Sequence, residues 1–180
     1  MLKSTKECLE EFGSQYQIRK MIKDGRLYKL EPGVYSDGIE HRTVEIVQFK
    51  YPSSVVTLNS AYYYYNLSDS IPDKLHLTME RRGTSILDSR VIEHQVPVGT
   101  LELGAIKTEL QGIPMRIYDR ERLLIETIRN ATKLPYDLYK EVIESFRNIK
   151  HELYPTKMTD YIEKMPRRDA ILRAVEKEVF

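Results

Sequence analysis

The chain has 180 residues, of which 41% are hydrophobic and 31% are charged, a composition that predicts a folded protein and excludes a disordered tail. Its 28 Lys and Arg residues nearly balance 27 Asp and Glu residues, so a charge-based function requires cations that are concentrated on one face. No run approaches about 18 apolar residues and no apolar signal region opens the chain, which predicts a cytoplasmic protein without a membrane partner.

Two short helices are predicted at the start of the chain. Ser4 can cap a helix over residues 5–12, Gly13 breaks it, and Ser14 can cap a second helix that stops at Gly25. The single cysteine lies on the apolar side of the first helix, where we expect it to be a small core residue, and one cysteine excludes an intramolecular disulfide. Two helices joined by a tight turn are typical of a helix-turn-helix.

A short hairpin is predicted after the second helix. Two strands flank a turn at Glu31-Pro32-Gly33, which contains the residues that favour tight turns. The residues expected to give the hairpin its apolar cover are Leu27, Leu30, Val34 and Tyr35.

Basic residues concentrate on the second helix and the hairpin. Between Ser14 and Leu30 the sequence contains five basic residues and one acid, a local net charge of +4. The helical period places Ile18, Met21 and Ile22 on a buried side, with the basic residues opposite. The residues expected to contact DNA are Gln15, Tyr16, Gln17, Arg19, Lys20 and Lys23 on the helix and Arg26 and Lys29 on the hairpin.

A helix-turn-helix followed by a basic wing is typical of a winged helix-turn-helix domain. Helix side chains would enter the major groove, where Gln15 and Gln17 could pair with adenine edges, and the wing would hold phosphates. One such module makes few contacts, so we expect two copies to bind an inverted repeat of double-stranded DNA. The alternative is that these basic residues only solvate a helix.

The domain boundary is predicted at residues 36–38, where turn-forming residues follow the wing. The expected fold class is α+β, with a winged helix-turn-helix domain over residues 1–37 and a mixed α+β domain over residues 38–180 that is helical from about residue 119. The second domain is expected to contain helices at residues 39–51, 58–66, 120–129, 136–149, 157–165 and 167–180, and an antiparallel set of strands at residues 53–57, 74–80, 91–96, 105–110 and 113–118.

Three segments resemble AbiEi-type antitoxins in order and spacing. They are IRKMIKDGRLYKLEPGVY in the first domain, and SSVVTLNSAYYYYNLSDSIPDKLHLTM and GIPMRIYDRERLLIETIR in the second. The resemblance implies an antitoxin of a type IV toxin–antitoxin, or abortive-infection, system. It implies a winged helix that represses its own operon from an upstream repeat, and a C-terminal domain that counteracts a nucleotidyltransferase-like toxin without a stable complex.

Motifs for catalysis, metal or cofactor binding are weak, so we expect a transcription regulator that is not an enzyme and needs no cofactor. One alternative is a metal-dependent nuclease domain, because Asp73, Glu80 and Arg82 resemble an acid pair with a basic residue, although a turn and a solvent-facing strand end explain them better. The four histidines lack metal-ligand spacing. A further alternative is an orphan transcription regulator with no toxin.

Two other groups are candidates for contacts. In the run of four tyrosines, Tyr62 and Tyr65 match the apolar side of a helix and are expected in the core, whereas Tyr63 and Tyr64 are expected to be exposed and could stack on bases. The doublet at residues 167–168 is a candidate second contact with DNA or RNA, although basic residues of this last third alternate with acids.

Overall fold

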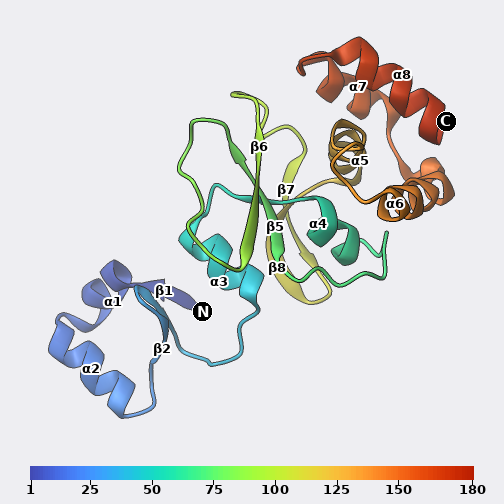
Figure 1. Cartoon of the computed structure of the whole chain (residues 1–180). Coiled ribbons are helices and arrows are strands. Elements are labelled where there is room, and N and C mark those ends of the chain that lie inside the picture. The colour runs from blue at the N-terminus through green and yellow to red at the C-terminus, as the bar shows by residue number, and fades with distance from the viewer. The chain divides into compact units, whose positions relative to one another are not determined.

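The computed structural model describes residues 1–180 and divides the chain into two units, unit 1 (Met1–Pro52) and unit 2 (Ser53–Phe180) (Figure 1). Eight α-helices and two sheets make it a mixed α+β protein, which confirms the predicted class at this level. None of the helices combines the length and the apolar character needed to span a membrane.

Unit 1 contains β1 (Leu2–Ser4), α1 (Thr5–Phe12), α2 (Gln15–Lys23), β2 (Tyr28–Glu31), β3 (Val34–Ser36) and α3 (Thr43–Lys50). Its strands form an antiparallel sheet in the order β1-β3-β2. β1 was not predicted, because three residues are too few to show a strand period. It pairs residue by residue with β3, so the first residues of the chain and the hairpin share one sheet.

The first two helices begin at the predicted serines. Ser4 Oγ accepts a hydrogen bond from the Glu7 N–H at 3.2 Å, and Glu7 Oε2 accepts one from the Ser4 N–H at 2.6 Å, which completes a capping box. Gly13 ends α1 with a φ of 81°, a conformation that favours glycine. Ser14 Oγ then accepts from the Gln17 N–H at 3.3 Å and starts α2. The predicted caps and the break between the helices are confirmed.

The core of unit 1 joins the two helices to the hairpin. Its buried residues are Cys8, Ile18, Leu27 and Tyr35, and the partly buried residues packed against them are Leu9, Phe12, Met21 and Ile22. The cysteine is free, and burial raises the pKa of its thiol, so it is a core residue as predicted. This packing holds α2 at a fixed angle to the strands that follow it.

Helix α3 belongs to unit 1, so the division between the units falls after Pro52, later than the boundary predicted after Asp37. His41 links the start of this helix to β3, since its Nε2 lies 2.7 Å from Ser36 Oγ and its Nδ1 lies 3.3 Å from Glu45 Oε1. Turn-forming residues mark a change in chain direction, but they do not show which unit the following helix joins.

Unit 2 contains β4 (Val55–Val56), α4 (Leu58–Tyr64), β5 (Leu75–Glu80), β6 (Val91–Val96), β7 (Ala105–Leu110), β8 (Ile113–Tyr118), α5 (Arg120–Arg129), α6 (Tyr136–Asn148), a short 3-10 helix (Lys150–Glu152), α7 (Pro155–Glu163) and α8 (Arg168–Val179). The predicted elements of this part are therefore all present, with ends that shift by a few residues.

The five strands of unit 2 form a mixed sheet in the order β6-β5-β4-β8-β7. β4 and β5 are antiparallel, as are β7 and β8, but β5 runs parallel to β6 and β4 runs parallel to β8. The predicted antiparallel arrangement is wrong for these two pairs. Alternating apolar residues locate a strand without fixing its direction, and here residues 81–90 carry the chain back between β5 and β6.

Helix α5 is the most deeply buried helix of unit 2, and helices α5 to α8 gather on one side of the sheet (Figure 1). Asp119 caps α5 as predicted, because its Oδ1 accepts from the Arg122 N–H at 2.8 Å. Leu123, Leu124 and Ile125 are fully buried. The position of α5 therefore fixes where the polar residues of the same helix lie.

Candidate nucleic-acid interface

Helix α2 buries one side and exposes the other. Ile18 is 1% exposed, and Met21 and Ile22 are partly buried against the core of unit 1. On the other side every residue expected to contact DNA is exposed, and Tyr16 keeps 73% of its surface accessible. The two sides predicted from the helical period are confirmed.

The basic residues of α2 and the hairpin are free of partners within the chain. All five are exposed and their side chains make no hydrogen bond or ion pair; they are Arg19, Lys20, Lys23, Arg26 and Lys29. By contrast, Lys3 Nζ donates to Glu11 Oε2 at 2.6 Å. Unpaired cations keep their field and their hydrogen-bond donors for an external anion.

The hairpin carries one of these cations, Lys29 on β2, whereas Arg26, which was predicted on the hairpin, lies in the bend between α2 and β2. Leu27 and Val34 are buried, which holds β2 and β3 to the core, while Lys29 points to solvent from β2. The strand register shifts between Lys29 and Glu31, so one extra residue bulges there and adds twist to the hairpin. Gly33 makes the turn with a φ of 82°. The structure thus brings the predicted residues together on one helix and the adjoining hairpin.

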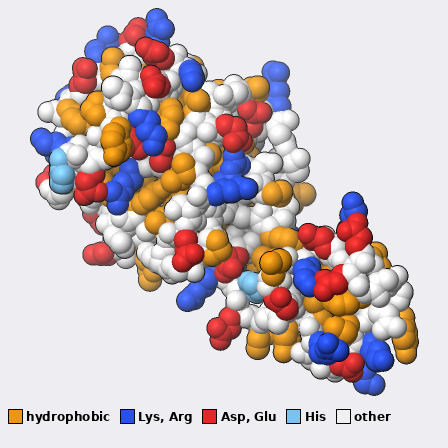
Figure 2. Space-filling view, turned by 180° about the vertical axis from the view of Figure 1, so that it is seen from behind, with side chains coloured by type: hydrophobic (Ala, Val, Ile, Leu, Met, Phe, Trp, Pro, Cys, Tyr) orange, Lys and Arg blue, Asp and Glu red, His pale blue; other side chains and the backbone are white.

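The surface of unit 2 has a different charge pattern. Figure 2 shows acidic and basic side chains intermingled over its visible face. Several charged residues of unit 2 are paired, as in Arg116 with Glu102 at 2.6 Å and Arg147 with Glu144 at 3.2 Å. Interleaved and paired charges produce little net electrostatic field, so this face is an ordinary solvent-exposed surface.

The residues of the nuclease alternative do not converge. Asp73 is exposed, whereas Glu80 Oε1 accepts a hydrogen bond from the Gly99 N–H at 2.5 Å. Arg82 adopts a φ of 72° in the loop after β5. No group of three or more His, Cys, Asp or Glu residues in the chain is arranged to hold a metal ion.

Two histidines that are far apart in sequence meet on neighbouring strands. His76 Nδ1 lies 2.9 Å from His94 Nε2, and the rings stack with centroids 5.0 Å apart. Burial, followed by the charge of His94, lowers the pKa of His76 to about 4, and burial lowers the pKa of His94. When both rings are neutral, one of the two facing nitrogens donates a hydrogen bond to the other. Sequence spacing missed this contact because it depends on the parallel pairing of β5 and β6.

The tyrosine run is more buried than predicted. Tyr62 is fully buried, and its hydroxyl lies 2.9 Å from Thr127 Oγ1, while the Tyr65 hydroxyl donates to the Tyr118 carbonyl at 2.9 Å. Tyr63 is half-buried, as is the tyrosine after it, so the expectation that both are exposed is wrong. The run contributes mainly to packing and to hydrogen bonds inside unit 2.

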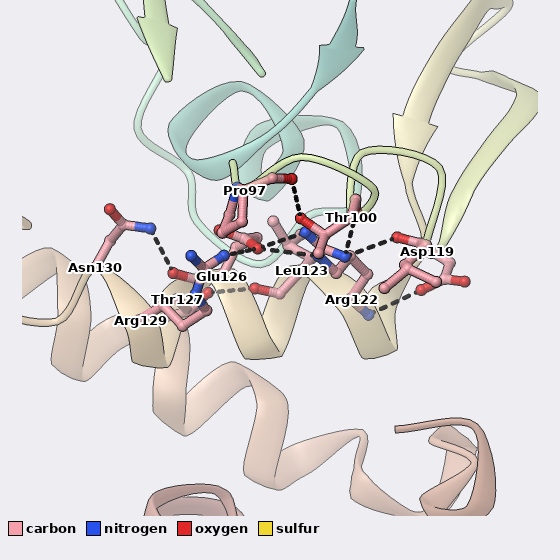
Figure 3. A network of polar contacts seen from close by, with 10 residues as sticks. Pro97, Thr100, Asp119, Arg122, Leu123, Glu126, Thr127, Arg129 and Asn130 are labelled. Atoms are coloured by element: carbon pink, nitrogen blue, oxygen red, sulfur yellow. Dashed lines mark hydrogen bonds and ion pairs between the residues drawn. The ribbon is translucent and has the colours of Figure 1, made fainter. Parts of the chain in front are cut away.

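Sequence reasoning also missed a polar network around α5 (Figure 3). Arg122 is completely buried, and its Nη1 donates to the carbonyls of Thr100 at 2.9 Å and Leu103 at 3.2 Å. Its guanidinium also lies 4.7 Å from the ring centre of Tyr118. The periodicity of the helix suggests a solvent-facing arginine, because the loop that covers it lies far away in sequence.

Glu126 connects this buried arginine to the surface. Its Oε1 accepts from Arg122 Nε at 2.9 Å and from Arg129 Nη1 at 2.6 Å, and Figure 3 shows the carboxylate lying between the two arginines. The only sequence signal was the spacing of four residues between Arg122 and Glu126, which permits an ion pair on one helix. The network holds Arg129 at the end of α5.

The chain as a whole is similar in fold to a solved structure, the "RV2827C protein from Mycobacterium tuberculosis". The two have a TM-score of 0.64 and 13% sequence identity over 97% of this chain and 72% of the other. No protein-family model matches the chain, and no curated protein matches it. These observations define a two-unit α+β protein with a helix–helix–hairpin arrangement in the first unit. The similarity to the solved structure extends over both units.

Proposed function

We propose that the protein is the antitoxin and autorepressor of a type IV toxin–antitoxin, or abortive-infection, system in the cytoplasm. In this proposal unit 1 is a winged helix-turn-helix domain that binds operator DNA, and unit 2 counteracts a nucleotidyltransferase-like toxin. The observation that carries the proposal is the set of five exposed cations with unpaired side chains on α2, in the bend that follows it and on β2. An exposed cationic helix followed by a cationic hairpin is suited to a duplex.

The proposed docking follows from the order of elements in unit 1. Helix α2 would lie in the major groove, with Gln15 and Gln17 at its first turn facing base edges. Lys20 and Lys23 would contact the groove walls, and Lys29 would hold a phosphate beside the groove. One helix and one hairpin give a small contact area, so two copies would bind an inverted repeat upstream of the operon.

The antitoxin part of the proposal rests on the resemblance of two segments of unit 2 to AbiEi-type antitoxins. These segments contain helix α4, strand β5, strand β8 and helix α5, which form much of the core of unit 2. The toxin would be counteracted without a stable complex, and unit 2 would act without a cofactor or an enzymatic step.

The DNA-binding part is tested by gel-shift titrations of the operon's upstream DNA at several salt concentrations. The variant carries both Lys20→Ala and Lys23→Ala, and the matched control carries Lys107→Ala and Lys177→Ala, two exposed cations of unit 2. We expect the first variant to bind about 10- to 100-fold more weakly near 0.1 M salt, with a salt slope lower by about 2. The control should bind like the wild type, and a first variant that also does so would refute the interface.

The toxin part is tested separately by growth. The proposal expects a nucleotidyltransferase-like protein to be encoded beside this chain, and cells that express it should grow when this chain is co-expressed and should stop growing without it. The variant with Lys20→Ala and Lys23→Ala should still protect, because it changes only unit 1. Specific DNA binding without any protection would support the orphan regulator instead.

A further inference from the structure

Unit 2 contains a cavity of about 370 Å³ that has a mostly polar lining. It is bounded by the chain between β4 and α4, by the ends of β5 and β6, and by the end of α5 with the loop that follows. A volume of this size accommodates a small molecule. The lining therefore indicates which chemical groups such a molecule would carry.

Three cations from separate elements line this cavity, namely Arg81 after β5, Arg129 at the end of α5 and Lys133 in the next loop. Arg81 and Lys133 are exposed and make no hydrogen bond or ion pair through their side chains within the chain. Arg129 is held in place by Glu126. Three converging cations favour a ligand with more than one negative charge.

The two carboxylates of the lining offset part of this charge, because three cations and two carboxylates leave a net charge of +1. Glu126 Oε1 already accepts from two arginines of α5. Glu93 Oε2 accepts from the Ile86 N–H at 2.6 Å, and its Oε1 accepts from the side-chain amide of Gln95 at 3.0 Å. Both carboxylates therefore have partners within the chain, whereas two of the cations have none.

A buried hydroxyl without a partner faces the same cavity. Thr57 is 1% exposed and lines the cavity, and its Oγ1 has no hydrogen-bond partner. Thr57 stands at the cap position of α4, where threonine usually bonds a backbone N–H, yet its side chain makes no such bond. A buried polar group left unpaired destabilises the fold, so this hydroxyl is a candidate donor to a ligand.

The backbone beside this hydroxyl is also unusual. Leu58, the next residue, adopts a φ of 41° and lines the cavity. Leucine rarely adopts this conformation, and such outliers cluster at binding sites. The strain and the unpaired hydroxyl lie at adjacent positions, which makes this edge of the cavity a built feature of the fold.

A second cavity of about 560 Å³ shares Arg81 and Arg129 with the first. Its wall combines apolar residues, which include Pro97, Ile128 and Ile171, with a third arginine, Arg167. The two cavities together offer a cationic, hydrogen-bonding part beside a part suited to a flat apolar group. A nucleoside phosphate has both parts in one molecule.

We propose that these adjoining cavities bind a nucleoside phosphate. Its phosphates would be held by Arg81, Arg129 and Lys133 with a hydrogen bond from the Thr57 hydroxyl, and its base and ribose would lie on the apolar wall. A single nucleotide fits better than a strand of RNA, because the face of unit 2 seen in Figure 2 intermingles acids with bases and shows no extended cationic track. The site lies in unit 2 and does not depend on DNA binding by unit 1.

The test titrates the full chain with ATP, GTP, CTP, UTP and inorganic pyrophosphate by calorimetry. We expect saturable binding of at least one triphosphate, weakened at least about 10-fold in Arg81→Ala and in Lys133→Ala. Lys107→Ala, which removes an exposed cation from β7, should bind like the wild type. The variant with Lys20→Ala and Lys23→Ala should also bind normally, which separates this site from the DNA interface.

Thr57→Val is the more specific test of the site, because it removes the hydroxyl without changing the shape of the side chain. The unfolding midpoint should stay the same or rise, since no hydrogen bond is lost in the free protein, while triphosphate binding should weaken several-fold. Absence of binding at millimolar triphosphate, or equal binding by Arg81→Ala and the wild type, would overturn the site. Pyrophosphate binding as tightly as the triphosphates, or binding of oligonucleotides alone, would overturn the choice of a nucleoside phosphate.

Discussion

Replacement of Gly104 by alanine tests how closely the loop before β7 covers helix α5. Gly104 has a φ of 74°, and a Cβ built on it would lie 2.4 Å from the Cβ of Arg122 and 3.0 Å from Asp119 Oδ1. The loop cannot easily withdraw, because the Gly104 carbonyl accepts from the Asp119 N–H at 2.7 Å. A Cβ atom cannot rotate away as the end of a long side chain can, so the helix or the loop must move.

The expected loss of stability has two parts. Alanine in a left-handed conformation costs about 1–2 kcal/mol, and forcing extra volume into a packed site costs about 1–3 kcal/mol more. The free energy of unfolding of Gly104→Ala should therefore fall by about 2–5 kcal/mol. This is a large share of the stability of an ordinary domain, about 5–15 kcal/mol.

Gly112 provides a matched control for the first part. Its φ is 75°, nearly that of Gly104, but no atom lies within 4 Å of a Cβ built on it. Gly112→Ala should lose only the conformational cost, about 1–2 kcal/mol. Urea unfolding followed by far-ultraviolet circular dichroism measures both variants, since the chain has no tryptophan. Equal losses in the two variants would show that the loop does not cover α5 as described.

Two further variants report on unit 2. Tyr62→Phe should lower the free energy of unfolding by about 1 kcal/mol, because it removes the hydrogen bond with Thr127. The control Tyr63→Phe should change it little, since the Tyr63 hydroxyl has no partner. Equal urea midpoints for the two variants would contradict this prediction. His76, whose pKa falls from 6.5 to about 4 through burial and then His94, binds fewer protons folded than unfolded between these values. The free energy of unfolding of the wild type should therefore decrease as pH falls through this window. His76→Asn should reduce that decrease by on the order of 1–3 kcal/mol, measured by urea titrations at each pH. The same dependence of the unfolding free energy on pH in both proteins would refute the prediction.

The elements that the sequence predicts well are those fixed by local chemistry. The capping serines and glycine breaks of α1 and α2, and the aspartate cap of α5, act over three or four residues and are visible in the sequence. The buried side of α2 follows from a period of 3.6 residues, which also fixes which residues are exposed. The predicted DNA-contacting set lies together for the same reason, because its members are near neighbours in sequence.

The features that the sequence did not reveal depend on distant parts of the chain. β1 is a strand only because β3 lies beside it, and β5 runs parallel to β6 because of the path of residues 81–90. Arg122 is buried because a loop at residues 100–104 supplies carbonyl acceptors to it. The cavity cations likewise come from a strand end, a helix end and a loop, so no local pattern joins them.

The side-chain contacts of the arginines in unit 2 distinguish those that support the fold from those that are free to bind an anionic ligand. Arg122 donates from Nε to the Glu126 carboxylate and from Nη1 to two carbonyls, so it holds the loop to α5, although its buried Nη2 has no hydrogen-bond partner. Arg81 has no partner and gains nothing for folding from its charge. Arg129 lies between these cases, because Glu126 orients it while it lines both cavities. The buried network therefore holds Arg129 in position before an anionic ligand binds.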